Sequence, residues 1–205
     1  MHSVFTHENL RGETPLRRAI RENKPEAVRI LLTVVDSELL FEECLLKDTI
    51  LQLAVKTYNT YVAPRDNEAA LEIIKLIFKC LGTFELTRRL FFLDKVDEWN
   101  NNIMHVVCWS GNVNLLRNMK SLIETAIDSA YFINLLSLKN KRGWSCLFQA
   151  IYSDNEAVFD DLLIIDEDLV NVLDYHGNNF IHRAITLGKY HYLLKSAQGA
   201  KRRKL

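Results

Sequence analysis

The sequence has few of the residues that interrupt regular structure. Only seven glycines and three prolines occur among its 205 residues, beside abundant Leu, Ile, Ala, Glu and Lys. An architecture of strands and turns needs glycine and proline at its many turns, so their scarcity favours helices. Apolar residues make up 48% of the chain and charged residues 25%, proportions typical of a globular domain. We therefore predict an all-α domain with one substantial core.

The chain also lacks the features of secreted and membrane proteins. It has no run of about 18 apolar residues, and its start, MHSVFTHENLRGE, has no apolar stretch behind a basic segment. Widely spaced cysteines without a CxxC pair favour reduced thiols over a disulfide framework. The cysteines are Cys44, Cys80, Cys108 and Cys146. We predict an intracellular protein of the cytoplasm, the nucleus or both, with no membrane partner.

Catalytic and cofactor signatures are missing as well. The sequence contains no GxxxxGK phosphate loop, no GxGxxG, no GxSxG elbow and no HExxH. The acidic residues between Asp154 and Asp174 lack the alternating oxygen ligands, the central glycine and the terminal glutamate of an EF-hand. We predict no enzyme activity, no cofactor, no metal and no small-molecule substrate.

One stretch has the composition of a reactive site. In NNIMHVVCWSG, residues 101–111, His105 precedes Cys108 by three positions, so a helix would place both side chains on one face. Such a pair could ligate a metal or act as base and nucleophile. The alternative is a structural role for both residues.

Charge is balanced overall but unevenly distributed. Between Asp154 and Asp174 the chain has eight acidic residues and no Lys or Arg, whereas seven basic residues and no acidic one follow Asp174. The acidic run is interpreted either as a solvated helix face or as a docking surface for a basic partner. The terminal group is interpreted as a nuclear-import-like signal or as a solubilising tail; it consists of Lys201, Arg202, Arg203 and Lys204. Because the rest of the chain is not basic, nucleic acid is not expected as the main partner.

A unit of sequence recurs along the chain. Its clearest copy consists of GETPLRRAI at residues 12–20, with Asn23, Val28, Leu31 and Leu32 after it. Thr14 can cap a short helix, and Pro15 fits the first helical position, where a missing N–H costs nothing. This copy resembles the ankyrin repeat pattern GxTPLHxAAxxGxxxxVxxLL at nearly every fixed position.

Four further copies match the ankyrin pattern with differing quality. They are TILQLAV at 49–55, NIMHVVC at 102–108, GWSCLFQAI at 143–151 and GNNFIHRAI at 177–185. The first of these is the weakest, because residues 56–67 are interpreted as an insertion between its two helices. Asn or Asp precedes four of the five start positions by three residues, which matches the hairpin turns of the family; these residues are Asn9, Asp97, Asn140 and Asp174. Left-handed residues are predicted to end three of the first helices, at Asn23, Gly111 and Gly188.

The resemblance covers roughly residues 9–197 and implies a single-domain ankyrin-repeat solenoid, residues 1–200, before a basic tail at 201–205. About five helix-turn-helix repeats with short hairpin turns are expected, the second of them degenerate with an insertion. The repeats lie near 9–35, 44–80, 97–120, 140–165 and 174–197. Between the matches, segments 36–46, 83–96 and 121–138 are predicted to be lengthened second helices or extra helices.

The resemblance also assigns positions to the histidine and cysteine of the 101–111 stretch. His105 and His182 occupy the family's histidine position, which holds the hairpin loops by hydrogen bonds. Cys108 occupies the second alanine position. These assignments favour the structural role over the metal-binding or catalytic one.

Partners of ankyrin proteins are usually held by the variable residues at the hairpin tips and at the ends of the first helices. The residues at such positions that we predict to bind a partner are Arg11, Trp99, Trp109, Arg142, Trp144, Tyr152, Tyr175 and His176. They include all three tryptophans of the chain, and large aromatic residues and arginine dominate protein interfaces. The alternative is that these rings pack against one another or cover the insertions.

The resemblance implies a non-catalytic regulator that binds a protein partner. In its small size and irregular second copy the chain resembles the small ankyrin inhibitors of cyclin-dependent kinases, and this resemblance implies a regulatory subunit or inhibitor of a protein kinase, in control of the cell cycle or of DNA replication. The alternative is an adaptor, or an inhibitor of a Rel-type transcription factor, of viral or host-directed kind. Rel inhibitors generally carry an amino-terminal phosphodegron and an acidic tail, and neither is expected here.

Overall fold

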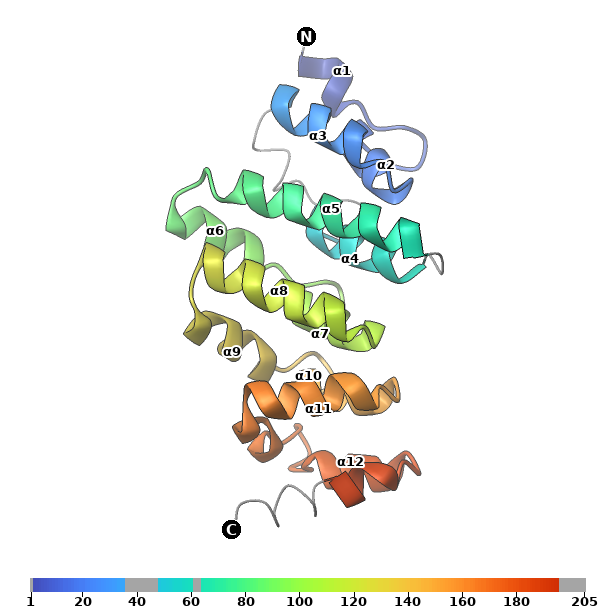
Figure 1. Cartoon of the computed structure of the whole chain (residues 1–205), viewed down its shortest axis with the longest axis vertical. Coiled ribbons are helices and arrows are strands. Elements are labelled where there is room, and N and C mark those ends of the chain that lie inside the picture. Colours follow the sequence, from blue (N-terminus) through green and yellow to red (C-terminus); the bar gives the residue numbers. More distant parts are fainter. Residues whose placement is uncertain (1, 36–47, 61–63, 196–205) are drawn as a thin grey trace. The chain divides into compact units, whose positions relative to one another are not determined.

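The computed structural model describes residues 2–35, 48–60 and 64–195. These residues form α-helices and one 3₁₀ helix, and they contain no strand, so the predicted all-α class is confirmed for them (Figure 1). None of the helices in these ranges is long and apolar enough to cross a membrane.

Contacts divide the chain into two compact units. The first unit is Met1–Glu98 with Met119–Ser129, and the second is Trp99–Asn118 with Ala130–Leu205. One of the three boundaries, between Asn118 and Met119, falls within helix α8 (Val113–Ala126).

The first unit is built from pairs of neighbouring helices. In chain order these are α1 (His2–Thr6), α2 (Pro15–Arg21), α3 (Pro25–Val34), α4 (Ile50–Thr60), α5 (Pro64–Leu81) and α6 (Leu86–Leu93). Helix α2 packs beside α3, and α4 beside α5 (Figure 1). Thr14 caps α2 as predicted, because its side-chain oxygen accepts a hydrogen bond from the N–H of Arg17.

Two predictions about residues added to the repeat pattern fall in the first unit, the insertion at 56–67 and the extra helix of segment 83–96. In the predicted insertion at residues 56–67, α4 continues to Thr60 and α5 begins at Pro64, and residues 61–63 lie outside the described residues. The described part of the predicted insertion therefore belongs to these two helices. Within segment 83–96, α6 is one of the predicted extra helices. Segment 36–46 lies outside the described residues.

The second unit contains α7 (Ile103–Ser110), α9 (Ser129–Ser137), α10 (Cys146–Tyr152), α11 (Glu156–Ile165), the 3₁₀ helix η2 (Glu167–Asn171) and α12 (Phe180–Thr186). Residues 191–195 are also helical. Helix α10 packs against α7, α11 and α12. The core of this unit contains buried rings, with Phe159 in contact with Phe180 and Tyr192. Helix α9 is the second predicted extra helix.

Left-handed residues end several helices or their following turns. The predicted positions are confirmed, with φ of 53° at Asn23, 72° at Gly111 and 71° at Gly188. Asp154, after α10, takes the same conformation with φ of 63°. Glycine and asparagine reach this region at low cost, so these residues set where each helix stops.

Candidate functional site

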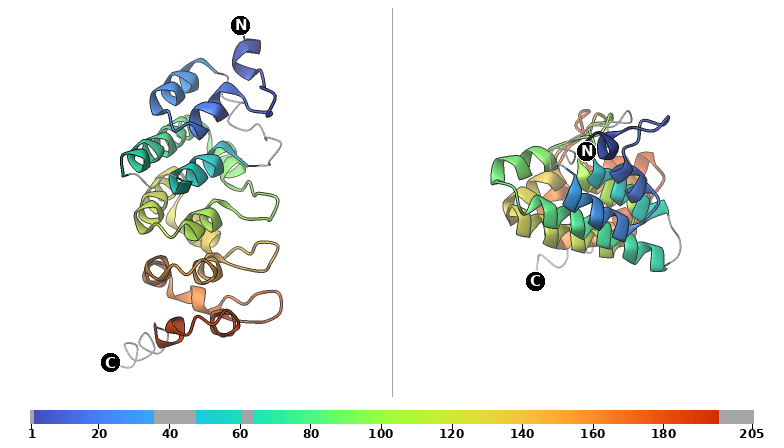
Figure 2. Two further views of the ribbon diagram at one scale, coloured as in Figure 1. Left: turned by 90° about the vertical axis from the view of Figure 1, so that its right-hand side faces the viewer. Right: turned by 90° about the horizontal axis from the view of Figure 1, so that it is seen from above.

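Two loops of the second unit share one backbone design. The basic loop, residues 139–145, lies between α9 and α10, and the aspartate loop, residues 174–178, precedes α12; both project to the same side of the unit (Figure 2). In the basic loop, Asn140 Oδ1 accepts from the N–H groups of Arg142 at 2.9 Å and Trp144 at 3.1 Å. In the aspartate loop, Asp174 Oδ1 accepts from His176 and Asn178, both at 2.9 Å.

The same turn forms in the first unit, where Asn9 Oδ1 accepts from the N–H groups of Arg11 and Glu13. The predicted turn role is therefore confirmed for Asn9, Asn140 and Asp174. At the fourth predicted position, Asp97, the start residue three places later is Asn100, which is left-handed with φ of 60°.

Contacts join the loops of the second unit into a continuous row. The N–H of Lys141 donates to the carbonyl oxygen of Trp99 at 2.9 Å, and the Asn140 side-chain amide donates to Asn101 Oδ1 at 2.8 Å. On the other side of the basic loop, Gly143 lies against Tyr175, because a Cβ at Gly143 would come 2.5 Å from the Tyr175 nitrogen. Trp99, the basic loop and Tyr175 thus follow one another.

His105 has the structural role that the resemblance implied. It is 1% exposed, its Nδ1 accepts from the N–H of Asn102, and its Nε2 donates to the carbonyl oxygen of Trp144 at 2.8 Å. His182 bonds to Asn179 in the same way at the start of α12. One histidine therefore ties the start of α7 to the basic loop.

The thiols of the second unit are buried in its core. Cys108 and Cys146 are both fully buried, and burial raises the pKa of the Cys146 thiol well above its ordinary value, with a further contribution from Cys108. A raised pKa leaves little thiolate, the form that attacks and that binds metals. Among the residues the structure describes, no three His, Cys, Asp or Glu side chains gather into a metal-binding group.

The predicted partner-binding residues differ widely in exposure. Trp99, Trp109 and Tyr175 are 55%, 52% and 63% exposed, and Tyr152 is 42% exposed. Arg142 and His176 are exposed as well. Arg11 is exposed but belongs to the first unit, in the loop before α2.

The prediction that Trp144 binds a partner is corrected, because this side chain is only 7% exposed and presents little surface to a partner. Its ring lies 5.0 Å from the Tyr152 ring, so the alternative of rings that pack on one another holds for this pair. The guanidinium groups of Arg142 and Arg183 lie 5.0 and 5.1 Å from the same ring. Trp144 therefore packs inside the unit, in contact with Tyr152 and with the two arginines.

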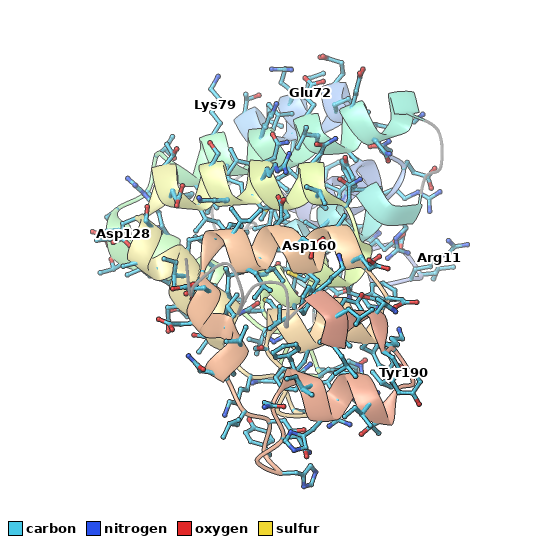
Figure 3. The ribbon with its side chains drawn as sticks, turned by 60° about the horizontal axis from the view of Figure 1, so that its bottom comes forward. Arg11, Glu72, Lys79, Asp128, Asp160 and Tyr190 are labelled. Carbon is cyan, nitrogen blue, oxygen red and sulfur yellow. The ribbon has the colours of Figure 1, made fainter. Side chains whose placement is uncertain are left out.

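The acidic run is largely paired within the unit. Arg117 donates two hydrogen bonds to Asp161, Lys189 lies 3.5 Å from Asp154, and Lys195 contacts both Glu156 and Asp160. Asp160 is on α11, and Tyr190 precedes the 191–195 helix (Figure 3). Much of the acidic surface that could attract an external basic partner is thus neutralised by the chain's own basic residues.

Asp174 supplies the single carboxylate of the aspartate loop, residues 174–178. Burial alone would raise its pKa, but hydrogen bonds from the N–H and amide of Asn178, from the N–H of His176 and from Arg183 outweigh burial and lower the pKa to about 2. Arg183 Nη2 lies 2.7 Å from Asp174 Oδ2. The carboxylate therefore stays ionised and holds the loop.

Sequence reasoning gave no role to Lys139, whose Nζ lies 5.8 Å from the centre of the Tyr175 ring. The cluster KNKR at residues 139–142 is the sequence signal that could have identified it. The terminal group Lys201, Arg202, Arg203 and Lys204 lies outside the described residues, so its two interpretations stay predictions.

No family model matches the chain, and no curated protein matches it either. Its function is therefore inferred from the residues and their geometry.

Proposed function

We propose that this protein is an ankyrin-repeat protein of about five repeats, and that it is a non-catalytic regulator that binds a protein partner. The partner contacts the aromatic surface, which we define as Trp99, Trp109, Tyr152 and Tyr175. Within this class, we favour a regulatory subunit or inhibitor of a protein kinase.

The assignment to the ankyrin family is supported by features that recur at the positions of the sequence pattern. Asn9, Asn140 and Asp174 form one kind of turn, and a left-handed residue follows at Gly12, Gly143 and Gly177. Asn102 and Asn179 cap their helices through identical bonds with a histidine. A pattern carried by turns, caps and helix ends at once is stronger support than a pattern in any one of them.

The observation that carries the binding role is the exposure of large rings in consecutive loops and helix ends. Trp99 and Tyr175 flank the basic loop, while Trp109 ends α7 beside Asn155, whose amide donates to its carbonyl oxygen at 3.3 Å. Burying such rings in a complex removes apolar area from water and costs little conformational entropy, since each side chain has only two rotatable bonds.

The first test compares partner capture by the wild-type protein and by the Trp99→Ala/Trp109→Ala double variant. Each is used for affinity purification from cells that express the protein, and bound proteins are identified by mass spectrometry. The partner is then purified and its Kd measured by calorimetry. We expect the double variant to bind at least tenfold more weakly, because rings of this kind often contribute more than about 2 kcal/mol each.

The matched control is Ile164→Ala, which removes a side chain of α11 that is 82% exposed and lies outside the aromatic surface. It should bind like the wild type. A folded double variant with unchanged affinity would contradict the proposed binding surface. For the kinase assignment, the purified protein is titrated into the captured kinase, and an unchanged phosphorylation rate would contradict regulation.

A further inference from the structure

The basic residues of the second unit fall into two groups. In its described part, residues 99–118 and 130–195, the Lys and Arg residues outside the basic loop all pair with carboxylates: Arg117 with Asp161, Arg183 with Asp174, Lys189 with Asp154, and Lys195 with Glu156 and Asp160. Within the same ranges, Lys139, Lys141 and Arg142 form no ion pair. The unpaired cations are therefore concentrated in one loop.

Two of the three cations of the basic loop lie beside aromatic rings. Arg142 lies 5.0 Å from the Trp144 ring and 5.7 Å from the Tyr152 ring, and Lys139 lies 5.8 Å from the Tyr175 ring. Stacking on a ring holds a guanidinium in position through its face and leaves its N–H donors at the edge for an acceptor. Arg142 is thus a positioned donor without a carboxylate acceptor in the described part of the unit.

The ring that Arg142 covers has an unpaired donor of its own. Trp144 is 7% exposed, and its indole Nε1 is buried with no hydrogen-bond partner among the described residues. A buried donor without an acceptor costs free energy, so such groups are rare in folded proteins. The donor belongs to the ring that Arg142 covers, and because this nitrogen is buried, the exposed guanidinium of Arg142 is the group that a partner can reach.

We propose that the basic loop binds an acidic segment of the partner protein, with Asp or Glu carboxylates received by Lys141 and Arg142. This inference rests on the proposed protein-binding function and specifies the chemistry of the partner. The flanking rings of Trp99 and Tyr175 pack on the aliphatic parts of the bound segment. Charge complementarity fixes which part of the partner enters the row of loops and raises the association rate.

The composition of the basic loop favours carboxylates over phosphates. Arg142 is the only guanidinium in the loop, and the nearby Arg183 is already bonded to Asp174. A phosphoserine is usually received by a cluster of arginines, and nucleic acid needs a longer stripe of cations along its backbone. Two lysines and one arginine fit the smaller charge of separated carboxylates.

The test measures binding of a fluorescent peptide rich in glutamate, by anisotropy, to the full-length protein. We compare it with the same peptide carrying glutamine for glutamate, with a phosphoserine peptide and with a single-stranded oligonucleotide. The glutamate peptide should bind most tightly, and its affinity should fall as salt is raised from about 50 to about 300 mM. Tighter binding of the phosphopeptide or the oligonucleotide would overturn the proposal, as would equal binding of the glutamine peptide.

Matched double variants separate the basic loop from general charge. Lys141→Gln/Arg142→Gln removes two unpaired cations, whereas Arg117→Gln/Lys189→Gln removes two paired ones and changes the net charge equally. We expect about a tenfold loss of affinity in the first and less than about twofold in the second, each checked for folding by circular dichroism. Equal losses in both would refute a role specific to the loop.

The same variants distinguish this inference from the function on which it rests. If Trp99→Ala/Trp109→Ala abolishes binding of the purified partner and Lys141→Gln/Arg142→Gln does not, the protein-binding function stands and the acidic-segment inference fails. If the wild-type protein binds no protein partner, the proposed function itself fails.

Discussion

The basic loop and the aspartate loop reach the same backbone shape with opposite electrostatics. Both are closed by a side-chain oxygen that accepts two backbone N–H bonds, and both contain a left-handed glycine, with φ of 77° at Gly143 and 74° at Gly177. In one loop the acceptor is the neutral Asn140, and in the other it is the carboxylate of Asp174. Asp174 forms an ion pair with the nearest arginine, Arg183, whereas Arg142 in the basic loop has no carboxylate partner in the described part of the unit.

Under the proposed function, the same turn serves folding in the aspartate loop and binding in the basic loop. A carboxylate in the turn contributes its own ion pair to stability, so the aspartate loop is held from within. An amide gives the same turn without consuming a cation, and the cations beside it remain available to a partner.

The strongest test of the comparison uses the two glycines. Both are left-handed, but a Cβ at Gly143 would lie 2.5 Å from the Tyr175 nitrogen, whereas a Cβ at Gly177 would meet nothing within 4 Å. Gly177→Ala should cost about 1 kcal/mol from backbone strain alone, and Gly143→Ala about 3 kcal/mol, because the clash is added. Urea unfolding measures both, and equal losses would show that the loops are not in contact there.

A second test is the acid dependence of the aspartate loop. The pKa of Asp174 is lowered from 3.8 to about 2, so the unfolded state binds the proton first as pH falls. The stabilisation, about 2 kcal/mol, is fully present above about pH 5 and is lost as the pH falls through about 2. Urea unfolding at a series of pH values measures this. The free energy of unfolding should fall more steeply with decreasing pH in the wild type than in Asp174→Asn, and an equal pH dependence in both would contradict the assignment.

The smallest effects separate the two arginines that flank Trp144. Arg183→Ala should cost about 1.5 kcal/mol, because Asp174 loses a charged hydrogen bond. Arg142→Ala should cost about 0.5 kcal/mol, the value of an exposed cation beside a ring. Thermal unfolding of the two variants gives the difference, and a larger loss for Arg142→Ala would mean that this side chain serves folding more than binding.

Much of the fold could be predicted because its signals are local. Thr14 caps α2, Gly111 ends α7 in the left-handed conformation, and Asn140 closes its turn, each through atoms within a few residues. The described part of the predicted insertion at residues 56–67 belongs to the end of α4 and the start of α5, and the sequence did not indicate this, since turn-like residues such as Asn59 and Pro64 are compatible with the end of one helix and the start of another.

The candidate site could be predicted only in part. Pattern positions identified Trp99, Trp109 and Tyr175, whose exposure the structure shows. They did not distinguish Trp144, which is at an equivalent variable position and yet is buried beside Tyr152 and beneath two arginines. A repeat pattern describes backbone positions, whereas burial depends on which side chains its neighbours carry.

By itself, the sequence determined the helical class, the turns, the helix caps and the histidine that ties α7 to the next loop, because these depend on each residue's own backbone and on close neighbours. Tertiary structure alone decided which rings are exposed and which cations are paired. Those outcomes depend on partners far apart in the chain, such as Arg117 with Asp161, 44 residues away, and no local pattern records them. The free cations of the basic loop are visible only after such pairs are known.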